Sequence, residues 1–102
     1  MVVVNYFDQV RELVKKVPKG KVTTYGDISK AFGKRDVRKV GWALHANRDV
    51  DCPCHRVVNK DGKLASGYAF GGEVEQRRRL FEEGVEFVDE LHVDLERCLW
   101  KG

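Results

Sequence analysis

The residues best suited to chemistry lie in the middle of the chain, at 51–58, which read Asp-Cys-Pro-Cys-His-Arg-Val-Val. Here Cys54 is followed directly by His55 and Arg56, so a thiol has an imidazole and a guanidinium as chain neighbours. Such an electropositive setting favours the thiolate, which is the nucleophilic form of cysteine. The alternative is that Cys54 is a small buried apolar residue, and this run alone leaves it open.

The other cysteines are Cys52 and Cys98, which makes an odd total in a chain whose start shows no secretion signal. A disulfide scaffold is therefore not expected. A zinc site is not expected either. Cys52, Cys54 and His55 lie too close together to match the spaced ligand pairs of structural zinc sites, and no second pair follows.

Length and composition indicate one domain over residues 1–102, because 102 residues with 42% hydrophobic content suffice for a single core. No apolar run approaches the roughly 20 residues that a membrane span needs. Residues 1–5 lack the features of a signal peptide. We therefore expect a protein of the cytoplasm or of the nuclear type, with no membrane contact.

The net charge is only +3, but its distribution is uneven. Basic residues concentrate in segments 15–21, 34–39 and 77–79, whereas acidic residues gather in the last fifth of the chain. Localised positive charge suits a phosphate backbone. A set of solvated helix faces explains the same pattern equally well.

Two short helices joined by a tight turn are expected between about residues 24 and 47. Thr24 can cap the first of them, and Gly33 suits the left-handed position that ends it. Asp36 can cap the second. This arrangement predicts a helix-turn-helix.

The second of these helices has a distinctive outer face. Arg38, Gly41, Trp42 and His45 follow helical spacing and share one side. A glycine within a helix costs about 1 kcal/mol relative to alanine, so Gly41 needs a reason. Close approach of another molecule is one, and tight packing against a neighbouring helix is the other.

Further helices are expected on both sides of this unit. Asn5 can cap a first helix that ends at Pro18 and Gly20. A fourth helix is expected from about Glu73 to Glu83, stopped by Gly84. Its buried residues are predicted to be Val74, Leu80 and Phe81. The tail could form a short hairpin that closes the core.

Residues 53–57 read Pro-Cys-His-Arg-Val, and in this the chain resembles the O6-alkylguanine-DNA alkyltransferases, whose signature this is. The resemblance covers about residues 5 to 88 and follows the C-terminal active-site domain of that family. The further matching segments are Thr24 to Ile28, Arg38 to Asn47, Gly67-Tyr68, Gly71-Gly72 and Leu80 to Gly84.

The resemblance implies a mainly α, winged-helix or helix-turn-helix-like single domain. It also implies a DNA-repair activity, the single-turnover methylated-DNA–protein-cysteine S-methyltransferase. An alkyl group would pass irreversibly from O6-alkylguanine in double-stranded DNA to Cys54, after the base is flipped out of the stack, as it must be to be reached. The protein would act as a monomer, with no cofactor and no metal.

The family's site residues map onto this sequence by motif. His55 would take the thiol proton through a water, and Glu83 would orient His55, which is the logic of a catalytic triad. The other catalytic residues would be Asn47, which braces the turn, and Tyr25, which protonates the leaving guanine. Arg38 would fill the gap left by the flipped base. The DNA-binding residues would be Arg38, Lys39, Gly41, Trp42, His45 and Thr24. The pocket would be lined by Val57, Gly67 and Tyr68.

Two rival interpretations remain. Alkyltransferase-like proteins bind O6-alkylguanine without transfer, and usually carry tryptophan or alanine at the nucleophile position; here Cys54 favours transfer. A plain helix-turn-helix regulator would explain the basic helix but not the Pro-Cys-His-Arg run. The loop from Gly62 to Gly72 is about two residues longer than is usual in the family, and Asn47 is followed by Arg48 rather than the frequent proline.

Overall fold

The computed structural model describes residues 5–34, 37–46, 49–66 and 68–102. Within them the helices are α1 (Tyr6–Val14), α2 (Tyr25–Ala31), α3 (Arg38–His45), α4 (Gly72–Glu82) and α5 (Leu95–Cys98), with one 3-10 turn, η1 (Cys54–Arg56). The strands are β1 (Thr23–Thr24), β2 (Val57–Val58), β3 (Phe87–Asp89) and β4 (His92–Val93). The predicted mainly α class is confirmed. No helix among these residues is both long and apolar enough to cross a membrane.

Helix α1 begins where the sequence predicts. The Asn5 side chain accepts a hydrogen bond from the Asp8 amide at 2.9 Å, which is the geometry of an N-cap. The helix ends at Val14, earlier than expected, because the next turn tightens. The Val17 amide bonds to the Val14 carbonyl at 3.0 Å, one residue closer than in an α-helix.

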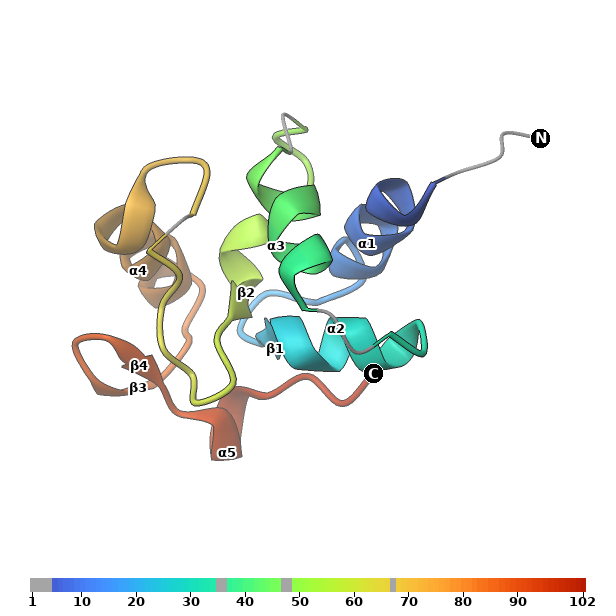
Figure 1. Cartoon of the computed structure of the whole chain (residues 1–102). Helices are drawn as coiled ribbons and strands as arrows, with labels where there is room; N and C mark the ends of the chain where they lie inside the picture. The colour runs from blue at the N-terminus through green and yellow to red at the C-terminus, as the bar shows by residue number, and fades with distance from the viewer. Residues whose placement is uncertain (1–4, 35–36, 47–48, 67) are drawn as a thin grey trace.

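Helices α2 and α3 form the predicted helix-turn-helix. The Thr24 hydroxyl accepts a bond from the Asp27 amide at 3.0 Å and so caps α2. Gly33 ends this helix with a φ of +67°, as expected. The predicted cap of α3, Asp36, lies outside the described residues. Helix α3 packs mainly against α1 and also contacts α2, which leaves its remaining face toward solvent (Figure 1).

The short strands β1 and β2 join the two halves of the core. They pair in parallel, with Thr23 opposite Val57 and Thr24 opposite Val58. Because successive side chains in a strand point to opposite faces, Val57 enters one hydrophobic cluster and Val58 enters the other. The first cluster lies among α1, α2 and α3, and it includes Cys52 and Cys54. The second lies beneath α4 and the β3–β4 hairpin.

The predicted buried face of α4 is partly wrong. Leu80 is buried, but Val74 is 85% exposed and Phe81 is 66% exposed. The helix buries only a narrow stripe, Gln76 and Leu80, which are four residues apart and therefore on the same side. Gly84 ends the helix with a φ of +87°, and the predicted C-terminal hairpin is confirmed.

The C-terminal segment returns to the middle of the molecule. The Val22 amide donates to the Cys98 carbonyl at 2.9 Å, and the Trp100 amide donates to the Val22 carbonyl at 2.7 Å. Residues from the end of the chain thus form a bridge beside β1.

Candidate functional site

The two neighbouring cysteines lie on a sharply folded turn between α3 and β2. Pro53 has φ −78° and ψ 65°, and the Cys54 amide bonds to the Cys52 carbonyl at 2.8 Å, which together define an inverse γ-turn. Cys54 then opens η1. Its side chain is only 6% exposed, and its Sγ lies 3.8 Å from the Sγ of Cys52. The Cys52 Sγ in turn lies 3.7 Å from the Arg11 carbonyl oxygen.

His55, the residue after Cys54, contacts Glu83, which is the carboxylate that the family motif assigned to it. His55 Nε2 lies 2.9 Å from Glu83 Oε2. Arg56 donates to both oxygens of the same carboxylate, at 3.0 Å from Nε and 2.8 Å from a terminal nitrogen. The other terminal nitrogen of Arg56 donates to the Val17 carbonyl at 2.6 Å. Glu83 therefore fixes two consecutive residues of η1 from the end of α4.

Burial and hydrogen bonding together set the charge state of this pair. It lowers the pKa of His55 below its ordinary value, although the hydrogen bond to Glu83 opposes the shift. Burial alone would raise the pKa of Glu83, but the hydrogen bonds from Arg56 and His55 outweigh it and lower that pKa. At neutral pH the site thus holds a neutral imidazole beside a carboxylate, which is the arrangement of a general base with its orienting group.

Tyr25 lies at the start of α2 and borders a cavity of about 260 Å³. The cavity is lined by Tyr25, Val37, Gly41, Asn59, Ala65 and Ser66. Burial, with a further contribution from nearby Cys54, raises the pKa of Tyr25 to about 12. Tyr25 therefore keeps its proton at neutral pH and can act as a hydrogen-bond or proton donor.

Two residues predicted to line the substrate pocket, Val57 and Tyr68, are not in the lining of this cavity. The Val57 side chain is wholly buried in the first hydrophobic cluster, because its pairing in β2 turns it inward. Tyr68 is also buried, and its hydroxyl accepts a bond from Arg79 at 2.7 Å. Burial raises the pKa of Tyr68 to about 12, although Arg79 opposes the shift. The two remaining predictions, Asn47 and Gly67, lie outside the described residues.

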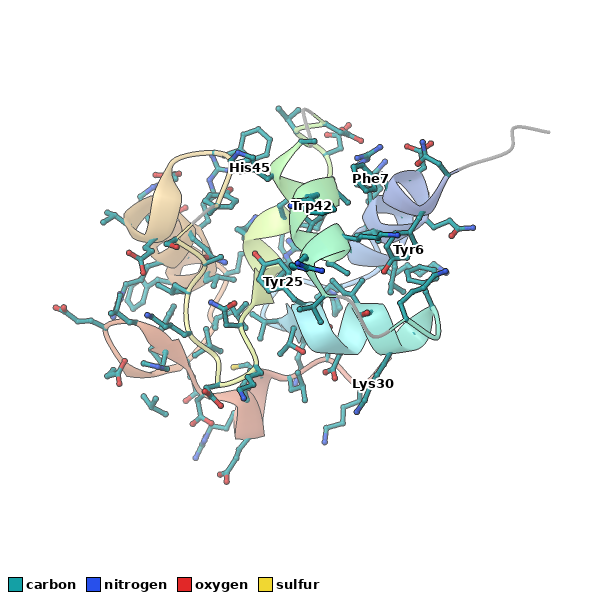
Figure 2. All side chains as sticks on the ribbon, in the orientation of Figure 1. Tyr6, Phe7, Tyr25, Lys30, Trp42 and His45 are labelled. Carbon is teal, nitrogen blue, oxygen red and sulfur yellow. The ribbon has the colours of Figure 1, made fainter. Side chains whose placement is uncertain are left out.

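The outer face of α3 carries the side chains predicted to meet DNA. Arg38, Lys39 and His45 are exposed, and Trp42 is 56% exposed. Figure 2 shows Trp42 and His45 along this helix, with Tyr25 at the start of α2 beneath them.

Gly41 and Thr24 differ from the rest of that predicted set. A Cβ built on Gly41 would meet no described atom within 4 Å. Internal packing therefore does not require this glycine, and the explanation by tight helix packing fails. Thr24 is buried, and the structure gives its hydroxyl a capping role.

Sequence reasoning missed one residue of the site, Gln76. It is 0% exposed, and its side chain bonds three backbone groups. Its oxygen accepts from the Ala65 amide at 2.7 Å, while its nitrogen donates to the carbonyls of His55 at 3.1 Å and Val57 at 2.9 Å. Gln76 thus ties the cysteine turn to the loop that lines the cavity. No signal marked it, because a glutamine among charged residues of a helix is typical of a surface position.

The described residues contain no group of three or more His, Cys, Asp or Glu side chains placed to hold a metal ion.

Comparison with known proteins matches residues 5–85 to the DNA-binding domain of 6-O-methylguanine DNA methyltransferase. The chain is 35% identical to alkyltransferase-like protein 1 of Schizosaccharomyces pombe, over 94% of both chains. It is 43% identical to the methylated-DNA–protein-cysteine methyltransferase of Methanopyrus kandleri, over 72% of this chain and 53% of that protein. The crystal structure of S. pombe Atl1 in complex with damaged DNA containing O6-carboxymethylguanine has a TM-score of 0.84 at 34% identity, over 100% of both chains.

The chain therefore spans nearly all of the alkyltransferase-like relative and about half the length of the methyltransferase. These matches confirm the resemblance inferred from the Pro-Cys-His-Arg-Val motif and account for the observed fold. The protein belongs to the 6-O-methylguanine DNA methyltransferase family, which comprises proteins of DNA repair and damage recognition.

Proposed function

We propose that this protein repairs O6-alkylguanine in double-stranded DNA by accepting the alkyl group on Cys54. The Cys54 sulfur attacks the alkyl carbon, so that the S–C bond forms while the bond from that carbon to guanine O6 breaks. His55 takes the thiol proton through a water, and Tyr25 supplies a proton to the departing guanine. Overall, the thiol proton is replaced by the alkyl group, and each molecule acts once because the thioether is stable.

One observation carries this proposal: Cys54 opens the turn whose next residue is paired with Glu83. Since His55 Nε2 faces the carboxylate, Nδ1 is the nitrogen available to receive a proton. The lowered pKa of His55 keeps that nitrogen unprotonated near neutral pH. The raised pKa of Tyr25 keeps its hydroxyl protonated. The protein environment thus favours His55 as the base and Tyr25 as the acid.

The exposed face of α3 supports recognition of DNA rather than of a small molecule. An alkyl group at guanine O6 lies within the base stack, so the nucleotide must be extruded before the thiol can reach it. Small residues allow a helix to approach the minor groove, and a wedge can hold the opened stack. Open space at Gly41 fits the first requirement, and the exposed Arg38 at the start of α3 fits the second.

Entry of the base requires the loop beside Tyr25 to move. Cys54 is buried in this state, and it does not line the cavity bordered by Tyr25, Ala65 and Ser66. We propose that this cavity, once widened, receives the extruded guanine.

The test is incubation with a duplex that contains O6-methylguanine, followed by mass analysis. Tryptic peptide 49–56, which contains Cys54, should gain one methyl group in place of one hydrogen, at one equivalent per protein. Cys54→Ser should abolish the gain and retain binding to the damaged duplex. Cys98→Ser should behave as the unaltered protein, since Cys98 lies in the other hydrophobic cluster.

The second candidate is recognition of the damaged base without transfer. The match to S. pombe alkyltransferase-like protein 1 over 94% of both chains favours it. Tight binding to the damaged duplex with no mass change at peptide 49–56 would assign the protein to that class. Transfer that survives in Cys54→Ser would refute both candidates, transfer to Cys54 and recognition without transfer.

A further inference from the structure

Cys52 has no part in the proposed transfer, yet it lies directly against the nucleophile. The two Sγ atoms are 3.8 Å apart, and both side chains are buried, with 3% and 6% exposure. The inverse γ-turn at Pro53 creates this proximity, because it folds the chain back between the two cysteines.

The separation is that of two sulfur atoms in non-bonded contact. The two sulfurs of a disulfide are about 2.0 Å apart, so closure requires an approach of roughly 1.8 Å. Rotation about the two Cα–Cβ bonds is the movement that closure needs. The Cα atoms of residues two apart cannot exceed about 7 Å even in an extended chain, and the turn shortens that distance toward the usual disulfide range.

A route to Cys52 is also present. A cavity of about 390 Å³ is lined by Cys52 with its neighbours Val50, Asp51 and Pro53, by His55 and Phe70, and by the basic side chains of Lys15, Arg56 and Arg79. Cys54 lies behind Cys52, at 3.8 Å between the two Sγ atoms. A molecule as small as hydrogen peroxide can enter a cavity of this size and reach Cys52, and the Cys54 sulfur is the next atom beyond it.

We propose that Cys52 and Cys54 form a reversible disulfide when the protein meets a hydroperoxide, and that this bond withdraws Cys54 from reaction with alkylated DNA. Formation of the bond is independent of the proposed repair activity. Only its consequence, protection of the nucleophile, rests on that activity.

The chemistry balances in two steps. The first attack is assigned to Cys54, because the hydrogen bond with Cys54 and burial raise the pKa of Cys52. The Cys54 thiolate attacks one peroxide oxygen; an S–O bond forms, the O–O bond breaks and hydroxide leaves, giving a sulfenic acid. The Cys52 sulfur then attacks the Cys54 sulfur; the S–S bond forms, the S–O bond breaks and the hydroxyl departs with the Cys52 proton as water. Two electrons pass from the thiol pair to the peroxide.

The experiment treats the fully reduced protein with hydrogen peroxide and maps its tryptic peptides after iodoacetamide. Both cysteines fall in peptide 49–56, which should lose two hydrogen masses and resist iodoacetamide, and dithiothreitol should reverse both changes. Cys98→Ser should give the same result. Cys52→Ser should show no such loss. If Cys52→Ser does not fold, the maps of the unaltered protein and of Cys98→Ser decide the question.

A second measurement separates this inference from the proposed function. Oxidised protein should take no methyl group from O6-methylguanine duplex, and dithiothreitol should restore acceptance. If the reduced protein accepts no methyl group, the repair function is refuted. The disulfide is then tested by the mass map of peptide 49–56 alone. Peptide 49–56 that gains oxygen, stays fully open to iodoacetamide, or becomes linked to Cys98 would overturn the disulfide.

Discussion

Glu83 holds a single carboxylate between two partners from the same turn. Arg56 bonds both of its oxygens and His55 bonds one, and all three side chains are between 11% and 14% exposed. Removal of one partner from a buried ion pair leaves an uncompensated charge and costs about 3–5 kcal/mol. The carboxylate therefore stabilises η1 as well as orienting the histidine.

The lowered pKa of His55 predicts the pH dependence of the reaction. In the proposed mechanism transfer needs the neutral imidazole, so its rate should fall as pH drops through the folded-state pKa of His55. Because burial places that pKa below the ordinary value of about 6.5, the midpoint of the decline in rate should lie below about pH 6.5. Single-turnover transfer measured across this range tests the expectation.

Glu83→Gln provides the control for this assignment. The carboxylate opposes the shift by raising the pKa of His55, so its removal should move the acid limb to still lower pH, in addition to slowing transfer. If the acid limb of the pH–rate profile does not move, a group other than His55 titrates there.

The lowered pKa of His55 also bears on folding stability. Between the folded-state pKa and the higher unfolded-state pKa, the unfolded chain binds more protons than the folded protein, so this residue should make the protein less stable as pH falls.

At the scale of elements, the open space over Gly41 separates two roles of α3. Gly41→Ala should raise the free energy of unfolding by up to about 1 kcal/mol, because alanine favours the helix and its methyl group meets no described atom. The same methyl group should weaken binding to a damaged duplex if this face approaches DNA closely. Urea unfolding and fluorescence anisotropy measure the two effects. A stabilised protein with unchanged DNA affinity would exclude close approach at this position.

Helix α4 positions the cysteine turn through the buried side-chain amide of Gln76. Gln76→Leu keeps the side-chain volume but leaves the Ala65 amide and the carbonyls of His55 and Val57 without their partner. Each buried unsatisfied group costs about 1–3 kcal/mol, so a large loss of stability is expected in thermal or urea unfolding. Gln9→Leu, at an exposed position of α1, should change stability by no more than about 0.5 kcal/mol. Equal losses in the two variants would contradict this role.

At the scale of the whole molecule, charge placement rather than net charge governs the expected affinity. The net charge of +3 is small, yet α3 presents exposed basic residues on one face. Binding to a duplex should weaken as salt rises, with a log–log slope that counts the phosphates contacted. Lys39→Ala should reduce that slope by about one. Arg78→Ala should not, since Arg78 is paired with Glu75 and Glu82 on α4.

Local signals predicted much of this architecture. The caps at Asn5 and Thr24 and the stops at Gly33 and Gly84 act within a few residues, so the sequence contains all the information they need. The buried face of α4 depends on which side meets the hairpin, and hydrophobicity alone wrongly placed Val74 and Phe81 inside. The pairing of His55 with Glu83 followed from the family motif, whereas Gln76 bonds backbone groups, which no residue pattern encodes.

The bridge between the C-terminal segment and Val22 has a practical consequence for protein engineering. Cys98 and Trp100 occupy both backbone groups of Val22, immediately before β1, and β1 is the strand that supports β2 and the cysteine turn. A chain shortened to end before Leu95 would lose these bonds and uncover Val22, so deletion at this end should loosen the distant cysteine turn. Labels or fusion partners are better attached beyond Trp100 than exchanged for the residues that precede it.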